Sequence, residues 1–215
     1  MAKIILMGYL FIGSVAAGQS QFGFFAGPQA GTARYTIHGE KQEVEWKYGF
    51  HAGAGWKIPF DKNLYFVPSF NYSLTGFSVT LNKPAFPPDV LAKNNDVTLH
   101  FADINFALQY NIGNNPSHLF FRAGASFNTI IRGTEKYELT DGKKISRNMK
   151  FNFRNYGRWL ASWIVQLGYE TKSDFFIAAR YVRMPNMDNA DEGPAIRPRT
   201  VMLTFGKFLK PRKKK

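Results

Sequence analysis

The sequence predicts an all-β protein, an eight-stranded antiparallel up-and-down transmembrane β-barrel. Three observations support this prediction. Apolar and polar residues alternate along eight segments, and the connections between these segments are alternately long and short. One face of the segments carries no charged side chain, whereas the other is rich in small and polar residues. A length of 215 residues fits one domain of this kind.

The first 20 residues are predicted to form a cleavable signal peptide. Lys3 precedes an apolar stretch at Ile4–Val15, which is shorter than the ~20 residues that a membrane-spanning helix needs. Small residues follow at Ala16–Gly18, as a signal-peptidase site requires. The chain has no cysteine, which excludes a lipoprotein anchor, a disulfide framework and thiolate metal sites. We therefore expect an exported protein with its barrel over residues 21–209.

Eight alternating segments follow the signal peptide. They run over Phe22–Ala33, Val44–Lys57, Leu64–Phe77, Val97–Ile112, His118–Arg132, Gly157–Glu170, Phe175–Met184 and Thr200–Phe208. Most are long enough to cross the hydrocarbon core of a membrane, which takes about 9–11 tilted residues.

The lengths of the connections predict how the barrel is oriented. Three connections are short and consist of turn residues: Ile58–Asn63, Gly113–Ser117 and Thr171–Asp174. The other four are longer and alternate with the short ones. In an even-stranded barrel this places all short turns at one rim, as in outer-membrane barrels with short periplasmic turns. We therefore expect an outer-membrane location with both chain ends in the periplasm.

The two faces of the segments differ in chemistry. The face predicted to contact lipid is aromatic and aliphatic, as in Trp46, Trp56, Phe106, Trp159 and Phe205. The other face carries glycine, serine and asparagine, which fit the narrow interior of an eight-stranded barrel. Its few charged and titratable residues predict a polar network in the lumen, formed by Lys47, His51, Asp103, Arg122, Arg158, Glu170 and Arg180. Buried charges need partners, and we expect the basic residues to pair with Asp103 and Glu170.

Two irregularities interrupt this pattern. Val97, Leu99 and Phe101 are out of phase with the apolar residues that follow Asp103. This predicts a bulge near Ala102 or an extension beyond the membrane. Pro68 lies within a predicted strand and has no N–H to donate, so we expect a local bulge or a missing hydrogen bond to a neighbouring strand.

Three stretches carry a family resemblance, namely FGFFAGPQAGTARY from Phe22, YGFHAGAGWKIPFDKNLYFVPSFNYSLTGF from Tyr48, and HFADINFALQYNIGN from His100. They resemble successive strands of the PorT-like outer-membrane β-barrel proteins of Bacteroidota. The resemblance extends to Phe208 and implies an eight-stranded outer-membrane barrel, but implies little about activity. The chain departs from the usual aromatic C-terminal end, because Leu209 and a basic tail at residues 210–215 follow Phe208.

The net charge of +13 indicates anionic partners. Export argues against nucleic acid, so we expect outer-membrane lipids and lipopolysaccharide. The loop at 132–155 carries the residues expected to contact lipopolysaccharide, namely Lys143, Lys144, Arg147, Lys150 and Arg154. The same loop is also typical of a solvated hairpin with its turn at Asp141–Gly142. The tail is expected to be periplasmic.

The sequence contains no catalytic motif, and we expect neither a cofactor nor a metal. The preferred function is a non-enzymatic barrel with a filled lumen that acts as a structural or adaptor subunit of a larger outer-membrane complex. Two alternatives remain open. One is a lipid- or peptide-directed hydrolase or acyltransferase at the outer surface, for which His38, Ser78, His100 and Asp103 are the candidates. The other is a soluble periplasmic calyx that binds a lipid.

Overall fold

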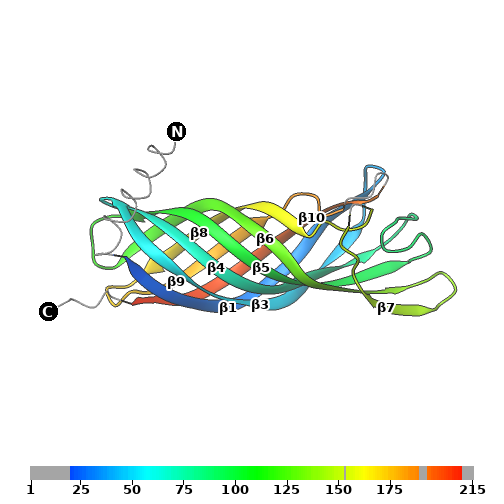
Figure 1. The fold of residues 1–215 in the computed structure, drawn as a ribbon, viewed down its shortest axis with the longest axis horizontal. Helices are drawn as coiled ribbons and strands as arrows, with labels where there is room; N and C mark the ends of the chain where they lie inside the picture. The colour runs from blue at the N-terminus through cyan, green and yellow to red at the C-terminus, as the bar shows by residue number, and fades with distance from the viewer. Residues whose placement is uncertain (1–19, 153, 189–192, 210–215) are drawn as a thin grey trace, which may run out of the picture.

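Ten strands form one antiparallel sheet in the computed structural model, which describes residues 20–152, 154–188 and 193–209 (Figure 1). The strands are β1 (Gln21–Ile37), β2 (Glu40–Lys41), β3 (Glu43–Asp61), β4 (Leu64–Thr80), β5 (Asn94–Ile112), β6 (His118–Glu138), β7 (Lys144–Asn148), β8 (Trp159–Glu170), β9 (Phe175–Arg183) and β10 (Ala195–Leu209). In these residues no helix is long and apolar enough to cross a membrane. The predicted signal peptide (apart from Ser20) and the basic tail lie outside the described residues.

Pairing of β1 with β10 closes the sheet into a ring. The wall follows the order β1, β3, β4, β5, β6, β8, β9, β10, with every neighbouring pair antiparallel. The seam extends from the pair Phe22 and Leu209 to the pair Thr36 and Ala195. β2 and β7 are short additions that pair with β1 and β6. The predicted up-and-down barrel of eight strands is confirmed, and closure leaves no free sheet edge in the wall.

Several strands extend further than predicted at the rim with the long connections, whereas β8 and β9 are slightly shorter there. β5 begins at Asn94 instead of Val97, β6 continues to Glu138 instead of Arg132, and β10 begins at Ala195 instead of Thr200. Figure 1 shows β7 and the long connections at one end of the elongated barrel and the short turns at the other. We call these ends the long-loop rim and the short-turn rim. The expected hairpin in the 132–155 loop is present as β6 and β7, with Gly142 at φ 87° in its turn.

An apolar belt surrounds the barrel. Along β8 the exposed residues alternate with buried ones from Trp159 to Glu170 without interruption. The outward residues of the belt are Phe24, Phe50, Trp56, Phe70, Ile104, Phe106, Leu108, Tyr110, Leu119, Phe121, Phe127, Trp163, Val165, Leu167, Ile177, Tyr181, Val201, Leu203 and Phe205. A continuous apolar surface of this extent indicates contact with a membrane.

Between the belt and the long-loop rim, the inward side chains of β5 change from polar to apolar. In β5, residues 95–111 keep one phase, with every odd residue buried. Asp103 and Asn105 point inward within the belt, and Val97, Leu99 and Phe101 point inward nearer the long-loop rim. The predicted bulge near Ala102 is therefore wrong for β5, and the irregularity lies in β6, where Ile131 is skipped between the partners of His100 and Phe101. The alternative, an extension beyond the membrane, agrees with this geometry.

Pro68 does not create a bulge. β3 and β4 pair at Gly55 with Ser69 and again at Ile58 with Phe66, in the same register, and the two intervening pairs are absent. Pro68 itself lies opposite Phe106 of β5, where the register is continuous. The ladder is thus interrupted on one side of the proline, as its missing N–H requires.

Arginine substitution at two outward alanines tests the depth of the belt. Ala179 lies between Leu167 and Leu203 in the middle of the belt, whereas Ala161 lies beyond Trp163 toward the long-loop rim. In lipid vesicles, Ala179→Arg is expected to lower the free energy of unfolding by about 2–4 kcal/mol and Ala161→Arg by about 0–1 kcal/mol. Urea titration followed by tryptophan fluorescence measures both values. Equal costs at the two positions would contradict the assignment of the belt.

Candidate functional site

An ion pair fills the lumen at the short-turn rim. The ammonium of Lys57 donates to both carboxylate oxygens of Glu170, at 2.6 and 2.7 Å. The two side chains are only 4% and 3% exposed. The Lys57 ammonium also lies 4.6 Å from the centre of the Tyr65 ring. Because buried charges are costly without partners, each member of this pair depends on the other.

A buried guanidinium forms the next layer. Arg122 donates from Nε to the side-chain oxygen of Gln109 at 3.2 Å and from Nη1 to that of Gln166 at 3.3 Å. Its guanidinium carbon lies 5.2 Å from the ring of Phe120 and 5.9 Å from that of Phe176. Four consecutive strands of the wall, β5, β6, β8 and β9, thus meet through one buried side chain.

Amides and carboxylates occupy the middle of the lumen. Asp103 accepts hydrogen bonds from Asn71 at 3.0 Å and from Asn128 at 2.7 Å. Arg180 donates to the side-chain oxygen of Asn105 at 2.6 Å. His51 lies 3.0 Å from the hydroxyl of Thr204. All these side chains are buried, and the hydrogen bond from Arg180 of β9 to Asn105 of β5 links strands that are separated by β6 and β8 in the wall.

Apolar side chains close the lumen toward the long-loop rim. This cluster contains Tyr35, Phe77, Leu99, Phe101, Ile130, Leu160, Met187 and Ile196. Glu135 is buried beside it and accepts hydrogen bonds from Arg147 Nε at 2.7 Å and from the Tyr156 hydroxyl at 2.8 Å. Burial, followed by the charge of Glu135, raises the pKa of Tyr156 well above its usual value. Its hydroxyl therefore stays protonated and remains a donor to Glu135.

Comparison with known proteins identifies the family. Residues 15–183 match the family described as outer membrane protein beta-barrel domain. The chain belongs to this outer-membrane β-barrel family. Comparison with curated protein sequences finds no matching relative.

Several solved structures are similar to this chain. Ail, the attachment invasion locus protein of Yersinia pestis, solved with the heparin analogue sucrose octasulfate, is 15% identical, with 88% of this chain and 99% of Ail covered and a TM-score of 0.44. OprG from Pseudomonas aeruginosa is 11% identical, with 90% and 97% covered and a TM-score of 0.45. AlkL in lipid bilayers is 12% identical, with 94% and 96% covered and a TM-score of 0.45.

The structure distributes the residues predicted for the lumen network of this β-barrel over two environments. His51, Asp103, Arg122, Glu170 and Arg180 are buried in the lumen. Neither arginine forms an ion pair with Asp103 or Glu170 within 4.0 Å among the described residues, and both bind amide oxygens instead.

Lys47 and Arg158 lie outside the lumen. β3 contains one extra residue between Trp46 and Phe50 relative to β4, which changes the phase of the strand. The Lys47 ammonium therefore contacts Asp96 at 2.6 Å and Thr98 at 2.7 Å, which alternate with buried residues of β5. Arg158 precedes β8, is exposed, and lies 5.4 Å from the Phe151 ring.

Lys57 is a buried lumen residue that the predicted network does not include. The sequence does indicate that the two residues lie near each other, because Lys57 and Glu170 each end a predicted segment at the short-turn rim. Their separation of 113 positions in the chain hides the pairing until the ring is closed.

The basic residues predicted to contact lipopolysaccharide in the β6–β7 region also lie in two environments. Lys143, Lys144, Lys150 and Arg154 are exposed. Arg147 is half-buried, and Glu135 neutralises it. Contact of these residues with lipopolysaccharide stays a prediction.

The candidate catalytic residues do not meet. Ser78 donates to Asp96, and Asp103 lies in the lumen between two asparagines. The ring of His100 lies 2.7 Å from the hydroxyl of Tyr72, and His38 is exposed after β1. No group of three potential metal-binding residues occurs among the described residues.

The buried ion pair is tested by a double-mutant cycle. Lys57→Met leaves the Glu170 carboxylate buried without its cation and is expected to lower the free energy of unfolding by about 3–5 kcal/mol. Adding Glu170→Met to that variant is expected to restore most of the loss, because no uncompensated charge is left. Urea titration in lipid vesicles measures all four proteins. Additive losses in the double variant would show that the two side chains do not interact.

Proposed function

We propose that this protein is a non-enzymatic, non-conducting barrel that acts as a structural or adaptor subunit of an outer-membrane complex. The observation that supports this most strongly is the filling of the lumen. The ion pair of Lys57, the layers around Arg122 and Asp103, and the apolar cluster follow one another between the two rims. A barrel filled in this way provides a rigid anchor and offers no aqueous path.

The connection between β4 and β5 supports an adaptor role. Phe86, Val90 and Leu91 are about half exposed there, at 46%, 55% and 54%. Two hydrogen bonds from the barrel hold this connection in place. The Tyr35 hydroxyl donates to the carbonyl of Pro87 at 3.4 Å, and Arg147 donates to the carbonyl of Pro88 at 2.7 Å. We call Phe86, Val90 and Leu91 the loop tip. Exposed apolar side chains on an anchored loop suit a protein partner, because little conformational entropy is lost on binding.

Orientation and lipid contacts complete the proposal. Gln21 and Leu209 lie at the short-turn rim, and we assign this rim to the periplasm and the loop tip to the outside. In this orientation we expect the exposed Lys143 and Lys144 to contact lipopolysaccharide. We also propose that residues 1–20 are an export signal. The three strand motifs further support the proposal that this protein is one of the PorT-like barrel proteins of Bacteroidota.

Native co-purification tests the adaptor role. The full-length protein, extracted in mild detergent, is expected to retain a partner that the variant Phe86→Ser/Leu91→Ser loses. Phe60→Ser, which removes an exposed phenylalanine next to the short-turn rim, serves as the control and is expected to retain the partner. Heat-modifiable migration on gels confirms that each variant folds.

Two results would contradict this proposal. Equal retention by the loop-tip variant and the wild type would exclude the loop tip as the docking surface. Stepwise ion currents through the purified protein in a planar bilayer would exclude a non-conducting barrel.

A further inference from the structure

Four arginines form a cluster on the outer wall of β1, β9 and β10. Arg34 of β1 lies directly opposite Arg197 of β10, and Arg183 of β9 lies directly opposite Arg199 of β10. Their chain neighbours Tyr35, Val182, Ile196 and Thr200 are buried, so the arginines belong to the outward face. Arg34, Arg183 and Arg197 are exposed and Arg199 is half-buried. We call these four residues the arginine cluster.

The arginine cluster has no anionic partner among residues 20–152, 154–188 and 193–209. None of the four forms an ion pair there. The Nε atom of Arg199 is fully buried and has no hydrogen-bond partner in the same residues. Like charges directly opposite each other in a sheet repel and lower stability. Two such pairs side by side favour the binding of an anion from outside the chain.

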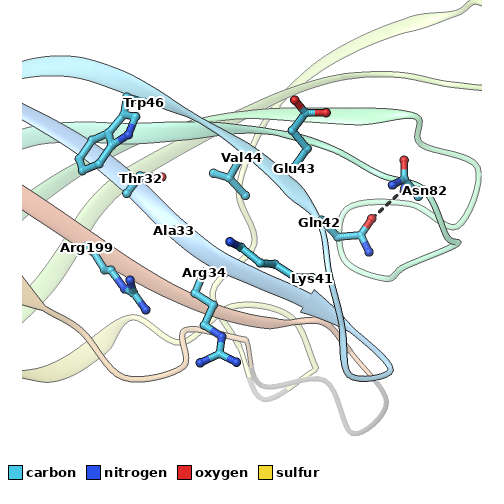
Figure 2. Close-up of a pocket in the computed structure, with 10 residues that line it drawn as sticks. All are labelled: Thr32, Ala33, Arg34, Lys41, Gln42, Glu43, Val44, Trp46, Asn82 and Arg199. Atoms are coloured by element: carbon cyan, nitrogen blue, oxygen red, sulfur yellow. Dashed lines mark hydrogen bonds between the residues drawn. The ribbon is translucent and has the colours of Figure 1, made fainter.

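A groove opens beside the arginine cluster because two strands separate. The ladder between β1 and β3 ends at the pair Gly31 and Lys47, and β1 next pairs with β2 at Thr36 and Lys41. The groove between the strands has a volume of about 830 Å³. Arg34, Lys41 and Arg199 contribute three positive charges to its lining, and Glu43 contributes one negative charge (Figure 2). In Figure 2, Arg34 and Arg199 extend from neighbouring strands to the same side of the sheet.

The position of the arginine cluster indicates what kind of anion binds. Arg183 lies directly opposite Trp163, a residue of the apolar belt that is 75% exposed. Along β10, Arg199 is the next outward residue after Val201 of the belt. The cluster thus begins where the lipid-facing surface ends. If an anion that binds there carries an apolar part, that part lies along the belt.

We propose that the arginine cluster and its groove bind the phosphate of a lipid headgroup in the leaflet at the long-loop rim. Guanidinium groups match phosphate with two parallel hydrogen bonds, which lysine cannot reproduce. The phosphate compensates the repulsion between the arginine pairs, and the acyl chains lie on Trp163, Tyr181 and Val201. This inference adds a lipid site to the barrel and does not depend on the adaptor role.

Binding of lipid A measures this site directly. The full-length protein is reconstituted in phosphatidylcholine nanodiscs with added lipid A, and native mass spectrometry counts the lipid A that each protein retains. Arg197→Gln/Arg199→Gln is expected to weaken retention by about tenfold or more. Arg197→Lys/Arg199→Lys keeps the charge and is expected to lie between that variant and the wild type.

Three controls separate this site from simpler explanations. Lys62→Gln/Lys172→Gln removes two exposed positive charges from the opposite, short-turn rim and is expected to leave retention unchanged. Dephosphorylated lipid A is expected to bind the wild type as weakly as phosphorylated lipid A binds the glutamine variant. Equal losses in both glutamine variants would reduce the effect to net charge and overturn the proposal. Complete competition by millimolar inorganic phosphate would identify a soluble anion as the ligand and would overturn the lipid assignment.

Discussion

Closure of the backbone ladder between β1 and β10 is the constraint on which the rest of this structure depends. The hydrocarbon core contains no water, so every N–H and C=O within it needs a partner in the protein. A sheet meets this requirement only when its first and last strands pair. The seam from Phe22 to Thr36 provides this pairing except at Gly27 and Pro28, where the ladder to β10 is interrupted. Deviations are correspondingly small. At Pro68 the ladder is interrupted while the register continues, and the extra residue of β3 lies beyond Phe50, toward the long-loop rim.

Closure with eight strands also determines the interior. An eight-stranded ring has room only for side chains, and the residues that point inward must therefore satisfy one another. Within the belt they include charged and amide side chains, as in the contacts of Asp103 with Asn71 and Asn128. Beyond the belt the wall is no longer surrounded by lipid, and the inward residues Leu99 and Phe101 are apolar, as in a soluble barrel. β5 thus has polar inward side chains within the belt and apolar inward side chains beyond it.

This reversal explains which features the sequence predicts and which it does not. The alternation at Trp163, Val165 and Leu167 predicts the lipid-facing surface, because a strand has a period of two. At Val97–Phe101 the same alternation leaves a bulge and an extension beyond the membrane as alternatives, because the phase there is constant while the solvent outside changes. Lys47 was misplaced because one extra residue in β3 turns it to the outer wall. The ion pair of Lys57 with Glu170 needs the register of the whole ring, which no local pattern contains.

The central claim is that β8 has lipid on one side and a filled lumen on the other, and a cysteine scan tests it most directly. The chain has no native cysteine, so single cysteines from Trp159 to Glu170 can be spin-labelled without background. In lipid vesicles, labels at Trp163, Val165 and Leu167 are expected to collide with oxygen but not with a water-soluble nickel complex. At Ile164, Gln166 and Gly168, the thiols are expected to resist aqueous reagents. Access of aqueous reagents to these inward positions, or of the nickel complex to the outward ones, would contradict the account.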